Sequence, residues 1–426
     1  MTEFTSSFMI FLKNHIASTV LVALALAVHF VWWGRARPPG DGWLGRSRTV
    51  VLLLTVLVLM GFVMEAQRIN RLLPIPVFVT IHSIGLGWSL ASLAIFAAQT
   101  ADLLLSGLVR LVRRKRPSGA AADAPESPDR RRLLQAVRGV IYATPAVALG
   151  YGTFIERDNF RVEEIVIPVA GLPQDLAGLT IVQITDIHMG AFLSEREVER
   201  IVAMANETRA NLAIMTGDLV TRAGDPVDVC LRHMARVKAD SGMIGCLGNH
   251  EIYAGAEDYV QREGARLGVR FLRSENLVME FRGHKLNFAG VDYQRRGSAY
   301  LVGAEKLIEP EMPNILLSHN PDVFPVAAGQ GFDLTLSGHT HGGQITVEYL
   351  QQFVNPARFV TRYVSGLYTE NNKRVYVSRG LGTVGVPTRL GAPPELSVIR
   401  LKPADPASGR LKPAVSAAGR LDPSAG

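Results

Sequence analysis

Five short polar motifs, each directly after an apolar run, constrain the fold of this 426-residue chain most strongly. Each apolar run has the length of a buried strand, and amphipathic stretches lie between the runs. We therefore expect an α/β domain over residues 162–402, with the motifs at the carboxyl ends of its strands, where such sheets bind ligands. In chain order the motifs are Asp186-Ile187-His188, Gly217-Asp218, Gly248-Asn249-His250-Glu251, Ser318-His319-Asn320 and Gly338-His339-Thr340-His341.

The motifs together supply carboxylate, amide and imidazole groups but no thiolate. This donor set suits Mn, Fe or Zn better than Ca or an iron–sulfur cluster. Asp186 and His188, like His339 and His341, are two residues apart, and in extended backbone such side chains point the same way. One such motif is common in proteins, whereas the ordered set indicates metal-assisted phosphoester hydrolysis.

The ordered set resembles the calcineurin-like metallophosphoesterase superfamily, whose pattern is D-x-H, G-D, G-N-H-[DE], H and G-H-x-H. The resemblance covers residues from about 178 to 345. Three features resemble a bacterial branch with membrane-anchored members: the hydrophobic N-terminus, the longer motif Gly338-His339-Thr340-His341-Gly342-Gly343-Gln344 and the motif Ser378-Arg379-Gly380-Leu381-Gly382. The resemblance implies a sandwich of two mixed sheets flanked by helices, with two divalent metal ions at the strand ends.

The resemblance also implies how the metal ligands divide between two sites that share Asp218. One ion takes Asp186, His188, Asp218 and His341, and the other takes Asp218, Asn249, His319 and His339. Two cations about 3.5–4 Å apart can lower the pKa of a bridging water. The implied reaction is attack of this metal-bridging hydroxide on phosphorus, with the cations neutralising the phosphoryl oxygens.

His250 is not needed as a ligand, and by resemblance it protonates the leaving alkoxide as a catalytic acid. Some family members orient this histidine with an aspartate three residues after the bridging aspartate, but here that position is Thr221. A threonine hydroxyl can accept a hydrogen bond but cannot stabilise an imidazolium by charge. Arg222, the next residue, is a candidate phosphate clamp, with a solvated surface arginine as the alternative.

The N-terminal third is too apolar for an ordinary soluble protein: the chain is 48% hydrophobic with mean hydropathy +0.17, and the excess precedes residue 155. We expect residues 1–154 to form an all-α transmembrane region. The expected helices are 16–33, 49–64, 75–98 and a weaker segment, 139–154. The net charge of +7 is exceeded by the eight basic residues between 110 and 132, which flank these segments, so we do not expect nucleic-acid binding.

The side of the membrane depends on segment 139–154. The basic loops before residue 49 and around 110–132 are expected to be cytoplasmic. If 139–154 spans, the domain at 155–402 lies on the extracytoplasmic side of a multi-pass cell-membrane protein, which is the placement we favour. The alternatives are a cytoplasmic domain and a twin-arginine-like export signal at Arg130-Arg131-Arg132.

The C-terminal residues and the two cysteines also allow predictions. Residues 403–426 are rich in Pro, Ala and Gly and are expected to be a disordered tail. Cys230, in an expected helix, and Cys246, in an expected strand, are interpreted as buried free thiols, with one disulfide as the alternative.

The expected function is that of a membrane-anchored two-metal phosphoesterase acting on a phosphodiester or a phosphomonoester, with a lipid-linked substrate as one class. One alternative is a lipid nucleotide-diphosphate hydrolase of the UDP-diacylglucosamine type. Another is a non-catalytic membrane sensor that binds phosphorylated ligands. Tyr253, Tyr293 and Asn320 are near the motifs in sequence and are expected either to line the pocket or to pack in the core.

Overall fold

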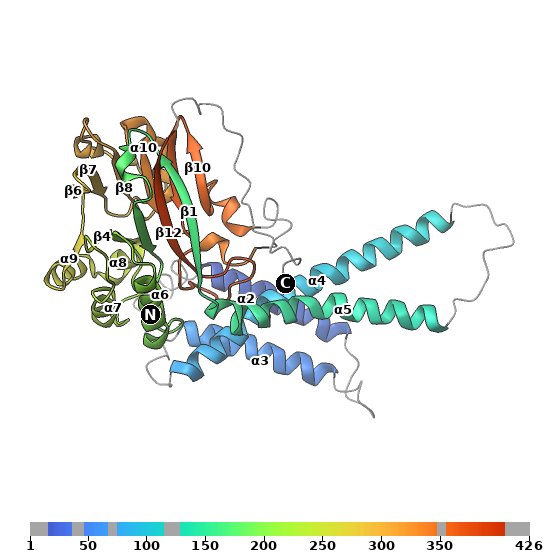
Figure 1. Cartoon of the computed structure of the whole chain (residues 1–426). Coiled ribbons are helices and arrows are strands. Elements are labelled where there is room, and N and C mark those ends of the chain that lie inside the picture. The colour runs from blue at the N-terminus through green and yellow to red at the C-terminus, as the bar shows by residue number, and fades with distance from the viewer. Residues whose placement is uncertain (1–15, 36–46, 67–74, 115–127, 347–354, 405–426) are drawn as a thin grey trace, which may run out of the picture. The chain divides into compact units, whose positions relative to one another are not determined.

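The computed structural model describes residues 16–35, 47–66, 75–114, 128–346 and 355–404 (Figure 1). The chain divides into two compact units. A helical unit comprises residues 1–159 together with Thr383–Leu390, and a second unit comprises 160–382 and 391–426. The expected tail lies outside the described residues from residue 405 onward.

In the described part of the helical unit there are four long α-helices: α2 (Ile16–Arg35), α3 (Ser47–Ala66), α4 (Ile75–Arg114) and α5 (Pro128–Phe154). Helices α2, α3 and α4 pack against one another, and α4 also packs against α5. Aliphatic side chains from three helices meet in a small core of Val22, Ala25, Val58 and Leu86. A polar contact joins the same three helices, because the His29 ring nitrogens lie 3.0 Å from Thr55 Oγ1 and 3.0 Å from Ser92 Oγ.

Helix α4 is longer than the expected segment 75–98, because it continues through Arg110 to Arg114. Part of the expected basic loop is therefore helical. At 1.5 Å per residue its 40 residues are about 60 Å long, twice the roughly 30 Å hydrocarbon core of a bilayer. Helix α5 likewise begins before residue 139, at Pro128, a residue suited to the first helical turn because its missing N–H is unpaired there anyway.

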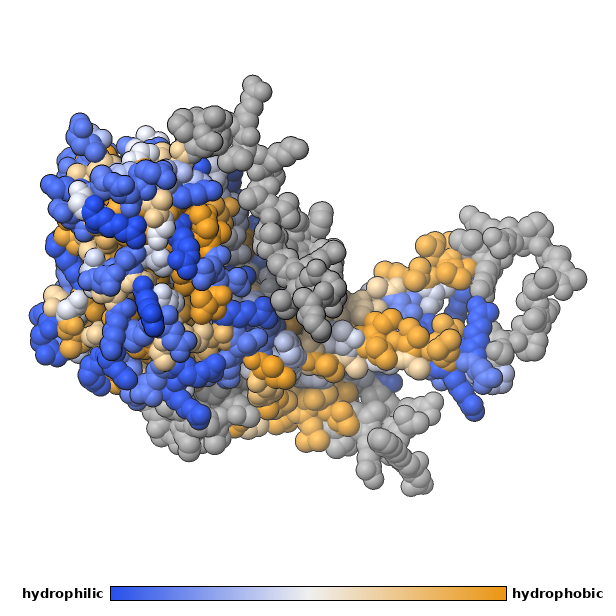
Figure 2. Space-filling view, viewed as in Figure 1, coloured by the Kyte–Doolittle hydropathy of each residue, from blue (hydrophilic) through white to orange (hydrophobic). Residues whose placement is uncertain are grey.

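Two helical stretches in the described residues, Ile84–Leu111 and Pro128–Asp158, are long and apolar enough to cross a membrane by length and composition. Shorter apolar stretches occupy Thr19–Arg35 and Val50–Met60. Apolar side chains are exposed along these helices, as the orange surface in Figure 2 shows. Clear examples are Leu103, Leu104, Leu105, Val140 and Val147, each more than half exposed.

Two six-stranded sheets form the second unit. The first has the order β1 (Arg161–Val169), β12 (Glu395–Pro403), β2 (Thr180–Ile184), β3 (Leu212–Thr216), β4 (Met243–Cys246) and β5 (Val269–Phe271). The second has the order β10 (Gly366–Glu370), β11 (Lys373–Val377), β9 (Leu334–Ser337), β8 (Asn314–Leu317), β7 (His284–Gly290) and β6 (Glu275–Phe281). Each sheet contains parallel and antiparallel pairs, so the expected sandwich of two mixed sheets is confirmed.

The core between the sheets consists of alternate strand residues, because successive side chains of a strand point to opposite faces. Ile181 and Ile214 of the first sheet share this core with Phe288, Ile315 and Leu336 of the second. The alternate residues of the first sheet pack beneath helices α6 (Glu195–Glu207), α7 (Val227–Met234) and α9 (Glu257–Arg266). Helix α10 (Phe324–Gln330) covers the second sheet in the same way. The central strands β2, β3, β4, β8 and β9 are therefore buried on two faces, which explains their nearly continuous apolar sequences.

Local signals in the sequence account for several element ends. Helix α6 begins after Ser194, whose backbone N–H donates to the Glu197 carboxylate at 2.6 Å in the expected capping box. Cys230 lies in α7 and Cys246 in β4, and both thiols are buried and free, as predicted.

Candidate metal centre

Five strand ends meet at one place in the second unit. Asp186 follows β2, Asp218 follows β3, and Asn249 begins α8 (Asn249–Ala254) just after β4. His319 follows β8, and His339 follows β9. Because the sandwich brings β2 and β3 of one sheet opposite β8 and β9 of the other, residues up to 153 apart in sequence become neighbours.

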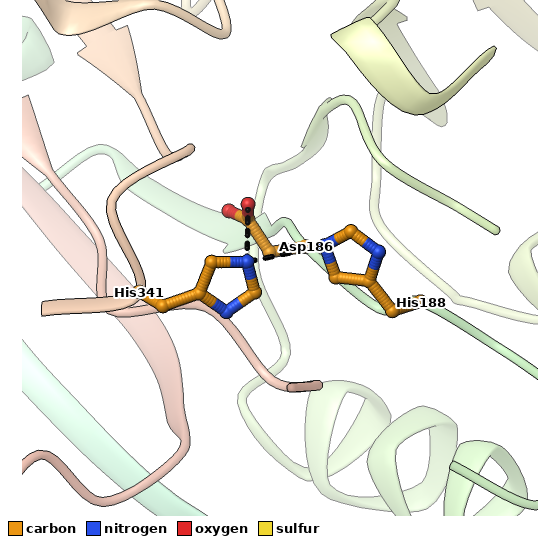
Figure 3. Close-up of side chains that lie close together, drawn as sticks. All are labelled: Asp186, His188 and His341. Carbon is orange, nitrogen blue, oxygen red and sulfur yellow. Dashed lines mark hydrogen bonds and ion pairs between the residues drawn. The ribbon is translucent and has the colours of Figure 1, made fainter. Parts of the chain in front are cut away.

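The first cluster contains Asp186, His188 and His341 (Figure 3). His341 Nε2 lies 3.3 Å from Asp186 Oδ1 and 3.1 Å from His188 Nε2. All three side chains are buried, and their ligand atoms lie within 4.8 Å of one another. Two imidazole nitrogens and a carboxylate oxygen thus converge where a cation can accept all three lone pairs.

The second cluster contains Asp218, His319 and His339. His319 Nε2 lies 3.0 Å from Asp218 Oδ2 and 3.1 Å from His339 Nδ1. Asp218 Oδ2 is also 3.5 Å from His188 Nε2 of the first cluster. The Asp218 carboxylate therefore lies between the two clusters, within reach of both.

Asn249 provides a test of whether a cation fits this arrangement. Its side chain is buried, and its Oδ1 atom has no hydrogen-bond partner among the described residues. A buried carbonyl oxygen without a partner is unfavourable in water-excluded surroundings unless a ligand satisfies it. The unsatisfied oxygen and the nitrogen- and oxygen-only donor set both fit a divalent cation.

The backbone that carries these side chains is left-handed at five positions. The φ angles are 51° at Asp186, 51° at His188, 59° at Asp218, 74° at His339 and 51° at His341. The expectation that the paired side chains lie in extended backbone is therefore wrong. Left-handed backbone is uncommon outside glycine and costs free energy, so it persists where function constrains the chain.

Glu251 fixes the backbone of two of the motifs. Its buried carboxylate accepts hydrogen bonds from the backbone N–H groups of Asp218 at 2.9 Å, Leu219 at 2.7 Å and Gly248 at 2.8 Å. One carboxylate thus ties the loop after β3 to the loop after β4. Glu251 belongs to the motif that begins at Gly248, but this role was not predicted from the sequence; its place two residues after Asn249 was the available signal.

Backbone carbonyls orient two of the imidazoles. His319 Nδ1 lies 2.7 Å from the Thr216 carbonyl oxygen, and His341 Nδ1 lies 3.3 Å from the Gly382 carbonyl oxygen. Because a carbonyl can only accept, each Nδ1 carries the proton in these bonds. In the neutral ring the lone pair then resides on Nε2, the atom that faces the cluster, as is usual for metal-ligating histidines.

The loop after β11 supplies the Gly382 carbonyl. Gly382 N–H donates to the Asp186 carbonyl at 2.6 Å, and Leu381 N–H donates to the Thr185 carbonyl at 3.2 Å. A Cβ at Gly382 would lie 2.1 Å from the Ile187 carbonyl oxygen, so the close approach requires glycine. The sequence of the motif at 378–382 does not predict this role, because Gly382 contacts residues that are distant in the chain, Asp186 and His341.

The charges of the site are strongly coupled. Burial raises the pKa of Asp186 to about 6. Burial also disfavours the Asp218 carboxylate, but His319 outweighs this and holds the pKa of Asp218 well below its ordinary value. Burial disfavours the His319 imidazolium, yet Asp218 and Asp186 raise its pKa to about 10, while burial and the His319 charge lower the pKa of His339 to about 3. A cation held by His319 would compete with a proton for the same ring nitrogen.

His250 lies at the edge of the first cluster. Its ring meets the His188 ring edge-on, with centroids 4.7 Å apart, and its backbone N–H donates to Asp218 at 2.9 Å. His250 Nδ1 is 2.5 Å from the Thr221 carbonyl oxygen. The Thr221 hydroxyl, the expected acceptor for His250, instead lies 3.3 Å from His188 Nδ1.

Arg222 lies beside Asp225 rather than inside the clusters. Its Nε atom is 3.9 Å from Asp225 Oδ1, and its side chain is about one third exposed. Asp225 also accepts from the backbone N–H groups of Thr221 and Arg222 at 3.0 Å each, so it shapes this turn. The guanidinium is thus partly accessible for an anion.

Two of the three neighbouring polar residues lie against the clusters. The Tyr293 ring is 5.4 Å from the His339 ring, and the Tyr253 ring is 5.3 Å from the His250 ring. Tyr253 is 58% exposed, so it is not a core residue. Asn320 is buried and bonded to the Gln294 carbonyl and the Asp322 N–H, so it shapes its loop instead.

Comparison with known proteins supports the same chemistry. The family profile described as calcineurin-like phosphoesterase matches residues 179–343. A Bacillus subtilis (strain 168) protein, the uncharacterized metallophosphoesterase YkuE, is 27% identical over 284 residues, which cover 64% of this chain and 97% of that protein. A Danio rerio protein, named transmembrane protein with metallophosphoesterase domain, is 30% identical over 316 residues, covering 70% of this chain and 69% of that protein. Phosphodiesterase YaeI of Escherichia coli (strain K12) is 27% identical over 280 residues, covering 64% and 98%.

Proposed function

Because the chain belongs to the calcineurin-like metallophosphoesterase family, and is thus a metal-dependent phosphoesterase, we propose that it hydrolyses a phosphodiester while anchored in a membrane. A divalent metal centre lies where the five strand ends meet. We propose two cations there, of Mn, Fe or Zn, with Asp218 as the shared ligand. The proposed ligands are Asp186, His188, Asp218 and His341 for one cation, and Asp218, Asn249, His319 and His339 for the other.

The position of Asp218 between the two clusters carries this proposal. Its Oδ2 atom is 3.0 Å from His319 Nε2 and 3.5 Å from His188 Nε2, so one carboxylate serves both. The unsatisfied Asn249 Oδ1 gives the second cluster a neutral oxygen ligand beside its two imidazoles. When bound, the cations would activate water for attack on phosphorus and neutralise the phosphoryl oxygens.

Side chains of the protein supply the other two proposed functions, proton donation and phosphate binding. In the doubly protonated ring, His250 Nδ1–H donates to the Thr221 carbonyl and so directs the second proton, on Nε2, for transfer to the leaving oxygen, which leaves a neutral imidazole. The carbonyl supplies direction but no full negative charge, unlike an aspartate. Arg222, partly exposed beside Asp225, is proposed to bind a non-transferred phosphoryl oxygen.

Two observations support the choice of substrate and location. The Escherichia coli relative is named a phosphodiesterase, which favours a diester over a monoester. The Danio rerio relative is named a transmembrane protein, and two described helical stretches of this chain have the length and apolarity of membrane spans. We propose a multi-pass protein with its catalytic unit on the extracytoplasmic side, where a lipid-linked phosphodiester in the membrane would be accessible to it.

The substitution Asp218→Asn tests the two-metal assignment. The amide keeps the size of the carboxylate but loses the charge that two cations share, so we expect hydrolysis of bis-p-nitrophenyl phosphate to fall at least about a thousandfold. The assay uses the full chain in detergent with Mn²⁺, and metal content is measured in parallel. Asp175→Asn is the control, because Asp175 is a surface residue whose side chain is 76% exposed. Hydrolysis at the wild-type rate in Asp218→Asn would contradict the proposed bridging role of Asp218.

A further inference from the structure

Tyr293 lies at the edge of the second cluster, in the loop that follows β7. Its ring centroid is 5.4 Å from that of His339 and 6.0 Å from that of His319. Within the part of the chain that the structure describes, no group hydrogen-bonds to the Tyr293 hydroxyl. The side chain is nevertheless half-buried, and the hydroxyl of a tyrosine removed from water usually has a partner. Tyr293 therefore brings an unused hydrogen-bond donor to the site.

The charge of the metal centre reaches this hydroxyl. Burial, followed by the charges of Tyr253 and Asp218, raises the pKa of Tyr293 to about 12. The phenol is thus within electrostatic range of Asp218, the carboxylate that lies between the two clusters. A neutral phenol can donate one hydrogen bond to an anionic oxygen.

Hydrogen bonds fix the backbone on both sides of Tyr293. The Val291 N–H donates to the Leu317 carbonyl at 3.2 Å, which extends the pairing of β7 with β8. The Gln294 carbonyl accepts from Asn320 Nδ2 at 2.7 Å. Leu317 ends β8, and Asn320 directly follows the histidine of the second cluster, so Tyr293 is held to the loop that carries this ligand candidate.

The carboxylate of Asp292, the residue before Tyr293, is held by an arginine. Arg273 Nε donates to Asp292 Oδ1 at 2.9 Å, and Arg273 Nη2 donates to Asp292 Oδ2 at 2.9 Å. Two parallel bonds of this kind fix direction as well as distance. Arg273 Nη1 also donates to Asp258 of α9 at 2.7 Å. Since Asp292 precedes Tyr293 directly, the pair restricts the positions that the phenol can take.

We infer that the Tyr293 hydroxyl donates a hydrogen bond to a phosphoryl oxygen of the substrate, and that Asp292 is a positioning residue for this contact. The inference rests on the proposed function, because it requires a phosphoester bound at the metal centre. His250 lies at the edge of the first cluster and Tyr293 at the edge of the second. A phosphoryl group between the clusters would therefore have a protein donor on each side.

The substitution Tyr293→Phe tests the hydroxyl alone, because the ring is kept. Hydrogen bonds to charged groups are strong, so we expect kcat/KM for bis-p-nitrophenyl phosphate to fall about ten- to a hundredfold. The assay uses the full chain in detergent with Mn²⁺. Affinity for inorganic phosphate, measured by titration calorimetry on the Mn²⁺-loaded chain, should fall about tenfold, whereas affinity for Mn²⁺ itself should not change. Tyr259→Phe is the control, because Tyr259 on α9 is 36% exposed, and it should match the wild type.

The substitution Asp292→Asn tests the positioning role. Asparagine offers one acceptor oxygen in place of two and turns an NH₂ group toward the Arg273 guanidinium, so the paired bonds are lost. We expect a smaller fall in kcat/KM than for Tyr293→Phe, and no further fall when both changes are combined, because Asp292 acts through the Tyr293 hydroxyl. Asp258→Asn is the matched control, since it removes the other partner of Arg273 and leaves the pair with Asp292 intact.

The outcomes separate this inference from the proposed function. Wild-type kcat/KM and wild-type phosphate affinity in Tyr293→Phe would overturn the inference. A loss of Mn²⁺ affinity that matches the loss of turnover would also overturn it, because the hydroxyl would then support metal binding instead of the substrate. Additive losses in the double variant would overturn the role of Asp292. A wild-type chain that neither binds Mn²⁺ nor hydrolyses bis-p-nitrophenyl phosphate would overturn the proposed function, and this inference with it.

Discussion

At the scale of single residues, the site is organised by backbone conformation as much as by side-chain identity. Five ligand candidates have positive φ, a conformation that L-residues adopt at a cost. Their loops are held in this state by buried hydrogen bonds, chiefly those to Glu251 and from Gly382. The free energy of these contacts keeps the ligands preorganised for the cations.

Glu251 offers a direct test of that preorganisation. In Glu251→Gln one carboxylate oxygen becomes an NH₂ group that faces backbone donors, so a buried N–H is left without an acceptor. We expect a loss of about 1–3 kcal/mol in unfolding free energy, because an unsatisfied buried donor costs that much. Mn²⁺ affinity should fall as well, since Asp218 is no longer fixed.

Urea unfolding and Mn²⁺ titration of the same samples check both effects. Glu280→Gln, an exposed glutamate on β6, is the matched control and should behave as the wild type. Equal stability and equal metal affinity for Glu251→Gln and the wild type would show that the three backbone bonds contribute nothing.

At the scale of elements, the sequence predicted the strands of the site well, because each motif follows an apolar run that the sandwich buries. The capping box at Ser194 likewise predicted the start of α6. The conformation of the motifs was not predictable in the same way. Alternation in extended backbone suggested that Asp186 and His188 point together, whereas left-handed turns bring them to the same cluster.

Helix ends in the N-terminal region were harder to predict than helix positions. The apolar segment 75–98 ends well before helix α4 ends. The helix continues because the leucines and arginines after residue 102 both have high helix propensity. Hydropathy therefore marks the apolar part of α4 but not its end at Arg114. The segment Thr383–Leu390 belongs to the helical unit through contacts with α5, more than 230 residues earlier, as between Thr153 and Thr388, and no local pattern encodes them.

At the scale of the whole molecule, the open question is the side of the membrane on which catalysis occurs. Basic residues cluster at the ends of α4 and α5, at Arg113, Arg114 and Arg130–Arg132, and positive flanks favour the cytoplasm. If α5 spans the membrane, as we propose, the catalytic unit that follows it would lie outside the cytoplasm.

A reporter fused after residue 402 tests this placement in cells. We expect activity from an alkaline phosphatase fusion, which folds outside the cytoplasm, and no signal from a fluorescent protein that folds only inside. The reverse result would place the catalytic unit in the cytoplasm and favour a nucleotide-lipid substrate of the UDP-diacylglucosamine type. A fusion after residue 66, at the end of α3, is the reference, because placing both basic loops in the cytoplasm puts this position on the same extracytoplasmic side as residue 402.

Two cations that share Asp218 are central to the proposed mechanism. The most direct measurement is anomalous diffraction at the Mn edge from crystals of the full chain grown with Mn²⁺. We predict two peaks about 3.5–4 Å apart. The Asp218 carboxylate should lie between them and Asn249 Oδ1 should be bound to one. A single peak, or an Asp218 carboxylate that contacts neither ion, would contradict the account.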